Sequence, residues 1–239
     1  MPNDLIVTGA TGRLARLLRP HWPDATWLAR GAPWPEGRGG TILNLAGVTD
    51  PSGPLEDNVT TAAAAIAEGA RRGARVFLMS SAAVYGQGMR DFHEEDAPAP
   101  LNAYGAAKAR MEALASGAIL LRLGNVAGAD ALLGRAAGHV TLDPAGPEGP
   151  VRSYIGPATL ARVLGHLFAT PSLPRILNIA EPPPIGMAAL LDAAGIDWSF
   201  GPERAGTIPR VGLDTARLQA ICPLPPADPA RMVAEWRAA

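Results

Sequence analysis

A tyrosine and a lysine four residues apart are the side chains of this sequence best suited to acid–base chemistry. Tyr104 and Lys108 lie at the start of an expected helix, so they share one face of it. A free phenol has a pKa of about 10, which is too high for a base at neutral pH, and a nearby ammonium lowers it. We therefore predict that Tyr104 exchanges a proton with a substrate oxygen and that Lys108 assists it.

A serine at the end of an apolar run could complete this site. Ser81 follows the segment 75–80, which we expect to be a buried strand. Its hydroxyl could donate a hydrogen bond to the reacting oxygen and stabilise the charge that develops there. Taken singly, a Tyr–Lys helix pair is more often a surface feature, and a serine at a strand end is usually a turn former. Together with a glycine-rich turn they predict the catalytic residues Ser81, Tyr104 and Lys108.

The glycine-rich turn lies between the first expected strand, 5–8, and the first expected helix, 12–19. Gly9 permits the sharp turn, Gly12 lets a pyrophosphate approach the backbone, and Ala15 allows close packing of the helix. Free N–H groups at the helix start then face the phosphates. A packing turn without a ligand is the alternative, but the position between strand and helix favours dinucleotide binding.

The residue that follows the second expected strand bears on the choice of cofactor. That strand, 25–29, is followed by Arg30, and the next acidic residue is Glu36. An acid at this point would bond the ribose 2′-hydroxyl of NAD, whereas an arginine accommodates the 2′-phosphate of NADP. We predict a preference for NADP over NAD, with Arg13 as a second contact. An ordinary surface role for Arg30 is the alternative.

Short apolar runs alternate with Ala-rich helical segments, which is typical of parallel strands joined by crossover helices. We therefore expect an α/β fold with a doubly wound, Rossmann-type parallel sheet. The further expected strands are 41–45, 75–80, 118–123 and 176–179. The further expected helices are 56–72, 104–115, 158–169, 187–194 and 230–236.

Composition excludes several classes of protein. The 239 residues carry a net charge of −1 with no basic block, so a nucleic-acid or membrane partner is not expected. Four scattered histidines and the single Cys222 argue against a metal site and exclude an intrachain disulfide. With no leader and no spanning segment in view, we expect a soluble, cytoplasmic protein.

These motifs together resemble the extended short-chain dehydrogenase/reductases, the NAD-dependent epimerase/dehydratase family, over nearly the full length. The resemblance rests on Thr8–Ala15, Leu45-Ala46-Gly47, Asn58-Val59, Met79–Gly86, Tyr104/Lys108, Arg122–Val126 and Val151–Ile155. It implies cofactor binding by Thr8, Gly9, Thr11, Gly12, Arg13, Leu14, Arg30, Leu45, Ala46, Gly47, Asn58, Tyr104 and Lys108. It implies substrate binding by Ser81, Ala82, Ala83, Asn125 and Arg152, the last of which grips a sugar-nucleotide diphosphate in the family. An ordinary surface ion pair is the alternative for Arg152.

Two departures from the family pattern matter. Ala82 and Ala83 stand where the family's dehydratases carry an Asp–Glu pair, so we do not expect a 4,6-dehydratase. Only about ten residues, 31–40, separate the second and third strands, too few for the usual crossover. We therefore expect the family's edge strand and its adenine-contacting Asp to be missing. Trp27 or Trp34 could cover the adenine instead, although a plain packing role is the simpler reading of both.

We expect residues 1–126 and part of 150–180 to form the dinucleotide-binding domain, and 127–150 and 181–239 a small substrate-binding lobe. The expected function is that of an NAD(P)-dependent epimerase or reductase acting on a nucleotide sugar or a related hydroxy/keto compound. The alternatives are a reductase of a small non-nucleotide carbonyl and a non-catalytic NADP-binding sensor or scaffold. The Ala-rich helices 58–72 and 104–115 resemble the family's dimer helices, so we expect a homodimer.

Overall fold

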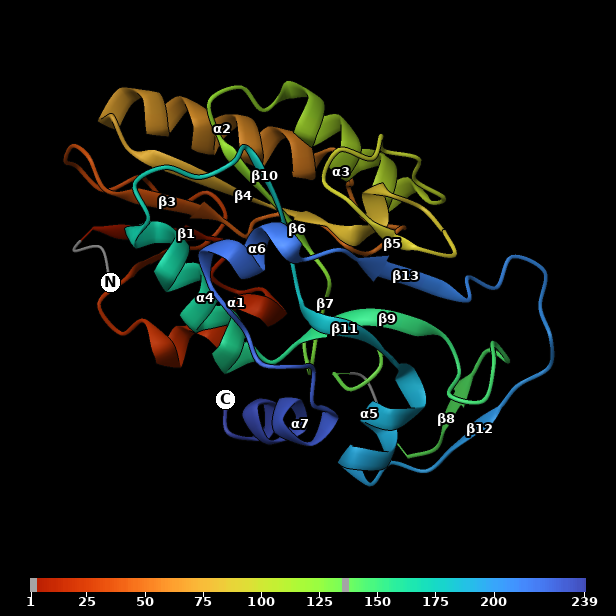
Figure 1. The fold of residues 1–239 in the computed structure, drawn as a ribbon. Helices are drawn as coiled ribbons and strands as arrows, with labels where there is room; N and C mark the ends of the chain where they lie inside the picture. The colour runs from red at the N-terminus through yellow and green to blue at the C-terminus, as the bar shows by residue number, and fades with distance from the viewer. Residues whose placement is uncertain (1–3, 135–137) are drawn as a thin grey trace.

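A six-stranded parallel sheet forms the centre of the structure, a computed structural model that describes residues 4–134 and 138–239 (Figure 1). The strands lie in the order β10-β6-β4-β3-β1-β2, and every neighbouring pair is parallel. Their bounds are β1 Leu5–Thr8, β2 Thr26–Leu28, β3 Thr41–Asn44, β4 Arg75–Ser81, β6 Ile119–Leu123 and β10 Ile176–Ile179. The expected Rossmann-type sheet is confirmed.

The apolar runs are continuous because both faces of the sheet are buried. In β1, Leu5 and Val7 belong to one core cluster, whereas Ile6 belongs to the cluster on the opposite face. Successive side chains of a strand point to opposite faces, so a strand covered on both sides needs apolar residues at every position.

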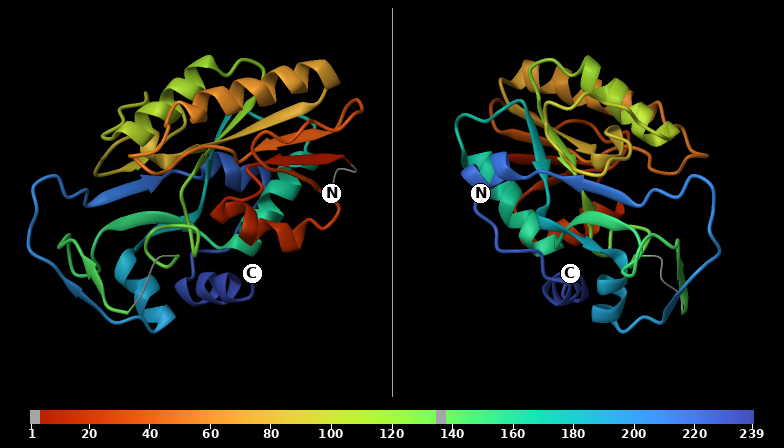
Figure 2. Two further views of the ribbon diagram at one scale, coloured as in Figure 1. Left: turned by 180° about the vertical axis from the view of Figure 1, so that it is seen from behind. Right: turned by 45° about the vertical axis from the view of Figure 1, so that its right-hand side comes forward.

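Helices cover the two faces. Helices α2 (Asp57–Arg72) and α3 (Ala103–Leu114) lie side by side over one face, and α1 (Arg13–Leu18), α4 (Pro157–Ala169) and α6 (Ala216–Ile221) lie on the other (Figures 1 and 2). The expected helices agree with these bounds to within one or two residues. The short α6 was not expected, although its Leu218 is fully buried in the core beside β10.

The sheet ends at β2, which pairs only with β1 among the described residues. No strand lies between β2 and β3 in this part of the chain, and residues 29–40 cross from one to the other as a loop. The expected loss of the family's edge strand is therefore confirmed. β2 itself is only three residues long, and a short edge strand offers little template for pairing with another chain.

Smaller elements, most of them from the second half of the chain, lie beside the carboxyl ends of the main strands (Figure 2). A five-stranded mixed sheet joins β5 Asp91–Phe92, β7 Asn125–Val126, β9 Val151–Ile155, β11 Glu181–Gly186 and β13 Arg210–Leu213. The same region holds the strand pair β8 Val140–Leu142 and β12 Trp198–Phe200 and the helices α5 Met187–Ala194 and α7 Pro229–Arg237. Elsewhere the chain forms two 3-10 turns, η1 Arg19–His21 and η2 Ala82–Val84. Within the described ranges, no helix is both long and apolar enough to cross a membrane.

Candidate active site

The turn after β1 is packed against the segment that follows β3. Gly9 has a φ of 77°, and a Cβ atom there would lie 2.7 Å from the backbone nitrogen of Ala46. Only glycine fits such a position without displacing its neighbour. Gly12 is the N-cap residue of α1, and Ala15 of that helix is completely buried. The local packing predicted from the glycine spacing is present.

This turn borders a cavity of about 350 Å³, which we call the glycine-turn cavity. Its walls come from the ends of β1, β2 and β3 and from one face of α2. The residues that line it are Thr8, Gly9, Thr11, Gly12, Leu28, Ala29, Arg30, Gly31, Ala32, Trp34, Asn44, Leu45, Ala46, Gly47, Thr61 and Ala64. Because these are mostly small residues at the carboxyl edge of a parallel sheet, the cavity is suited to a dinucleotide.

Eight of the thirteen residues predicted to bind the cofactor line this cavity, and five do not: Arg13, Leu14, Asn58, Tyr104 and Lys108. The Arg13 guanidinium donates to the Asp130 carbonyl oxygen over 3.1 Å, and Leu14 packs against the main core. Asn58 lies beside the cavity, where its amide donates to the Val48 and Leu55 carbonyl oxygens. A Cβ at Gly47 would lie 2.4 Å from the Asn58 side-chain oxygen, so Asn58 shapes the wall without lining it.

Arg30 is the charged side chain among the described lining residues. Its guanidinium forms an ion pair of 2.5 Å with Asp57 at the start of α2. The Arg30 side chain is 67% exposed, so solvent screens this pair strongly. A guanidinium thus lies at the end of β2 as predicted, but with a carboxylate beside it.

Lys108 lies deep between the cavity and the sheet. Its ammonium donates to the Met79 carbonyl oxygen over 2.8 Å, and a Cβ at Gly47 would lie 3.4 Å from its nitrogen. Burial lowers the pKa of Lys108 to about 8, and the negative charge of Glu112 acts in the opposite direction. Lys108 therefore adjoins the floor of the glycine-turn cavity at Gly47.

Tyr104 and Ser81 share a second cavity, of about 240 Å³, which we call the serine–tyrosine cavity. The Asn102 side chain caps α3 by accepting from the Gly105 N–H over 2.8 Å, which fixes the first turn that carries Tyr104. Burial raises the pKa of Tyr104, and a side-chain hydrogen bond with Ser81 acts in the opposite direction. Burial therefore favours the neutral form of the phenol.

The predicted substrate residues line the same cavity. The full set of lining residues is Ser81, Ala82, Ala83, Gly86, Leu101, Asn102, Tyr104, Gly124, Asn125, Arg152, Ser153, Ile208 and Val211. Arg152 donates to the Val151 and Ile208 carbonyl oxygens, each over 2.8 Å, and burial lowers its pKa. None of the described lining residues is acidic. The side chains that line the cavity therefore include one positive charge, three hydroxyls and two amides.

A buried ion pair beneath the site was not predicted from the sequence. Arg122 on β6 makes a two-pronged contact with Glu112 on α3, and Ser80 donates to the same carboxylate over 2.5 Å. Both charged side chains are at most 5% exposed. This pair joins α3, which carries Tyr104 and Lys108, to the sheet.

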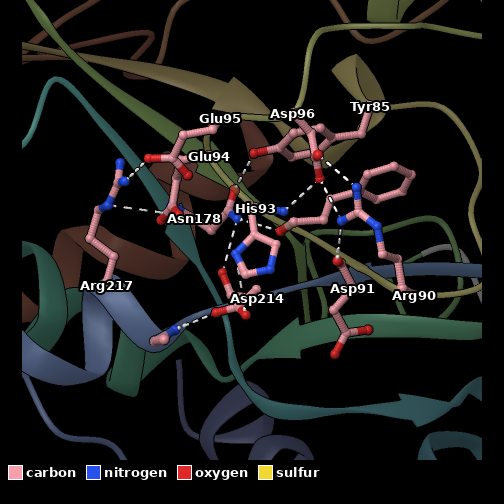
Figure 3. Close-up of polar contacts among 12 residues, drawn as sticks. Tyr85, Arg90, Asp91, His93, Glu94, Glu95, Asp96, Asn178, Asp214 and Arg217 are labelled. Carbon is pink, nitrogen blue, oxygen red and sulfur yellow. Dashed lines mark hydrogen bonds and ion pairs between the residues drawn. The ribbon is translucent and has the colours of Figure 1, made fainter.

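A polar network outside both cavities holds the segment 85–96 in place (Figure 3). The Tyr85 hydroxyl donates to Asn178 on β10 over 2.8 Å, and Asn178 in turn donates to the carbonyl oxygens of Phe92 and Asp214. Burial raises the pKa of Tyr85 to about 12. Because these groups satisfy one another and line neither cavity, we assign the network to structure rather than to chemistry.

Several lining residues were missed from the sequence. Thr61 and Ala64 line the glycine-turn cavity. They follow Asn58 on the same helix by one turn and by nearly two, so helical spacing from Asn58 could have indicated them. Ile208 and Val211 reach the serine–tyrosine cavity because β13 pairs with β9, and no local pattern signals that pairing. In the described ranges, no cluster of three or more metal-ligating side chains is present.

Comparisons with known proteins agree with this architecture. Residues 41–141 match the sequence model of the NAD-dependent epimerase/dehydratase family. No curated protein matches the chain in sequence.

Solved structures of similar fold cover almost the whole chain. MoeE5 in complex with UDP-glucuronic acid and NAD has a TM-score of 0.75 at 20% identity, over 98% of this chain and 99% of that chain. The UDP-glucose 4-epimerase of Thermus thermophilus in complex with NAD has a TM-score of 0.73 at 20% identity, over 99% of each chain. RMD from Pseudomonas aeruginosa complexed with NADPH has a TM-score of 0.73 at 19% identity, over 100% of this chain and 98% of that chain.

At these identities the structural likeness establishes the fold, and the family match over residues 41–141 adds the relationship in sequence. Together they show a shared fold over almost the whole chain and a likeness in sequence to the NAD-dependent epimerase/dehydratase family over residues 41–141. The resemblance of this chain to the NAD-dependent epimerase/dehydratase family is thereby confirmed.

Proposed function

We propose that this chain is an NAD(P)-dependent epimerase or reductase that acts on a nucleotide sugar, or a related hydroxy/keto compound, through Ser81, Tyr104 and Lys108. The observation that carries the proposal is the placement of Tyr104. It shares a cavity with Ser81 and Arg152 and lies one helical turn from Lys108, which adjoins the glycine-turn cavity. The two side chains of α3 therefore adjoin different cavities: Tyr104 lines the serine–tyrosine cavity, and Lys108 lies beside the glycine-turn cavity.

The residues present fit a nicotinamide dinucleotide. Gly9, Gly12 and Gly47 keep side chains out of the cradle at the carboxyl edge of the sheet. In the proposal, Thr8, Thr11 and the backbone around Gly12 hold the phosphates. When bound, the nicotinamide ring would supply hydride exchange with the substrate carbon.

Each catalytic residue has a separate task. Burial keeps the Tyr104 phenol neutral, which is the form that donates a proton when a ketone is reduced. Ser81 donates a hydrogen bond to the same oxygen. The reverse step needs the phenolate, and the positive charge of Lys108 would stabilise it.

The lining of the serine–tyrosine cavity supports the substrate class. Arg152 is largely buried, and its hydrogen bonds go to backbone carbonyls, so its charge is available to an anion such as a diphosphate. Asn125 would add an amide contact. Ala82 and Ala83 supply no acid or base beside the leaving group, which favours epimerisation or reduction over dehydration.

We further propose a preference for NADP, based on Arg30 at the end of β2. Among the described residues of the cavity wall there is no acid to accept from a ribose 2′-hydroxyl. The ion pair with Asp57 reduces the positive charge available to a 2′-phosphate. Dissociation constants for NADPH and NADH decide the matter, and tighter binding of NADH would refute the preference.

We also propose a homodimer formed through α2 and α3. Small exposed residues such as Ala63, Ala67 and Ala113 line the outer surfaces of these helices, and Leu114 is 68% exposed. Small side chains permit close helix packing. Sedimentation should give twice the mass of the chain, and Ala67→Glu should give the monomer. A monomeric wild-type protein would contradict the proposal.

The test of function is a screen with product identification. The protein is incubated with nucleotide sugars and NADPH or NADP⁺, and products are assigned by NMR while cofactor absorbance is followed. An epimerase forms the epimer without net change in cofactor, whereas a reductase consumes one NADPH for each product. Firm cofactor binding with no turnover of any substrate would instead support a sensor or scaffold.

A further inference from the structure

We propose that Trp34, on the loop that replaces the family's edge strand, is the stacking platform for the adenine ring of the cofactor. The inference rests on the proposed function in one respect, namely that the glycine-turn cavity receives a dinucleotide. It assigns the contact with the adenine ring to Trp34, which lies on the shortened loop between β2 and β3.

The first support is the position of the indole. Trp34 lines the glycine-turn cavity together with Leu28 at the end of β2 and Ala64 on α2. It is the aromatic side chain among the described lining residues, and most of the others are too small to cover a purine. A flat ring thus lies at the end of the cavity formed by β2 and α2, beyond the glycine turn.

The second support is that the indole is held from behind. Trp34 is partly buried and packs against the core cluster between the sheet and α2, as do Leu28, Val59 and Ile66. One part of the ring therefore has permanent apolar contacts, and another part faces the cavity. A half-buried aromatic ring of this kind loses little rotational freedom when a base stacks on it.

The third support is the rigidity of the loop. Arg72, the last residue of α2, donates to the Pro35 carbonyl oxygen over 2.7 Å, and its own carbonyl accepts from the Gly39 N–H over 2.7 Å. The Arg72 side chain is only 5% exposed. These contacts fix the loop on the C-terminal side of Trp34, so this part of the platform is held in place before the ligand arrives.

The other tryptophan near β2 is engaged elsewhere. Trp27 stacks on Trp22 with a centroid distance of 6.1 Å, and the Arg19 guanidinium lies 5.0 Å from its ring. It packs against the core on the opposite face of the sheet and does not line the cavity. Of the two candidates raised by the sequence, Trp34 is therefore the one placed to meet a base.

The physical basis is base stacking, which needs a flat ring and no particular hydrogen-bond pattern. The missing edge strand removes the carboxylate that the family places near the adenine. Stacking on Trp34 would supply affinity that depends on the adenine moiety without an acidic partner. The alternative is that the indole fills the space that the adenine ring needs, in which case Trp34 weakens cofactor binding.

The experiment compares probes with and without adenine. Dissociation constants of NADPH and of reduced nicotinamide mononucleotide, which lacks the adenosine half, are measured for wild type, Trp34→Ala and Trp34→Phe. Trp198→Phe, on β12 in the distal part of the chain, is the matched control. We expect Trp34→Ala to weaken NADPH binding about ten-fold or more, with the mononucleotide unchanged and Trp34→Phe close to wild type.

A second readout is spectroscopic. Adenosine 2′,5′-bisphosphate should quench the indole fluorescence of wild type and of Trp198→Phe but not that of Trp34→Phe. Unchanged or tighter NADPH binding by Trp34→Ala overturns the platform and favours the obstructing role, while leaving the proposed function intact. Equal losses for both probes also overturn it, because they report general damage. A wild-type protein that binds none of the adenine-bearing probes overturns both proposals.

Discussion

The glycine-turn cavity and the serine–tyrosine cavity differ in how they are assembled. The glycine-turn cavity is built from the ends of three neighbouring parallel strands and one helix, all within residues 8–64. The serine–tyrosine cavity collects residues from 81 to 211, including the β9 and β13 region of the mixed sheet. The first is an edge of a regular sheet, and the second depends on long-range pairing of short strands. The residues around the glycine-turn cavity could therefore be predicted from local sequence, whereas those around the serine–tyrosine cavity depend on pairings that no local pattern signals.

The largest effect is expected on stability, when the buried Arg122–Glu112 ion pair that joins α3 to the sheet is broken. Glu112→Ala removes the partner of the buried Arg122, and leaving such a charge unpaired costs about 3–5 kcal/mol in the free energy of unfolding. Urea denaturation measures the loss. Glu95→Ala, whose ion pair with Arg217 involves an exposed carboxylate, is the control and should change stability little. Similar small effects of both substitutions would show that α3 does not depend on the pair.

The next largest effect is expected on NADPH binding, when a side chain is added at the glycine turn. Gly9→Ala and Gly73→Ala both place a side chain at positive φ, but only the Cβ at residue 9 would meet a neighbour, Ala46, at 2.7 Å. We expect Gly9→Ala to weaken NADPH binding about ten-fold or more, because the turn must shift into the cavity. Gly73→Ala should bind like wild type. Fluorescence titration measures both, and equal affinities would contradict a role for the turn in binding.

Some elements of the fold could be predicted from the sequence, and others could not. The sheet, its helices and the missing edge strand followed from the spacing of apolar runs, since periodicity is a local property. The buried Glu112 was not predicted, because its partner Arg122 lies on a different element and only the folded sheet brings them together. The strands β5, β7, β8, β9, β11, β12 and β13 were not predicted either, because they are short and lack a continuous apolar run or carry turn residues.

On the substrate side, Arg152 should affect binding more than turnover. If it holds a diphosphate, Arg152→Ala raises KM for a nucleotide sugar about ten-fold or more and leaves kcat nearly unchanged. Arg152→Lys should recover part of the loss, because the charge is kept while the paired geometry is not. Steady-state kinetics separate the two parameters. A fall in kcat at constant KM would place Arg152 in the chemical step instead.

A smaller effect is expected from pH. Lys108 is charged below its lowered pKa of about 8 and neutral above it, so its help to Tyr104 declines as the pH rises through 8. The profile of kcat/KM for the free enzyme should therefore fall above pH 8. In Lys108→Arg, which stays charged, the residual activity should not fall there. A wild-type profile that stays flat up to the pKa of free lysine, about 10.4, would show that the charge is not needed.

The central claim is that Tyr104, which lines the serine–tyrosine cavity, transfers the proton to or from the substrate oxygen. The most direct measurement is kcat of Tyr104→Phe on the substrate identified in the screen, alongside its dissociation constant for NADPH. We predict that kcat falls about 10²–10⁴-fold, the usual contribution of a general acid or base, while cofactor affinity stays within error of wild type. Turnover by Tyr104→Phe at the wild-type rate would contradict the account.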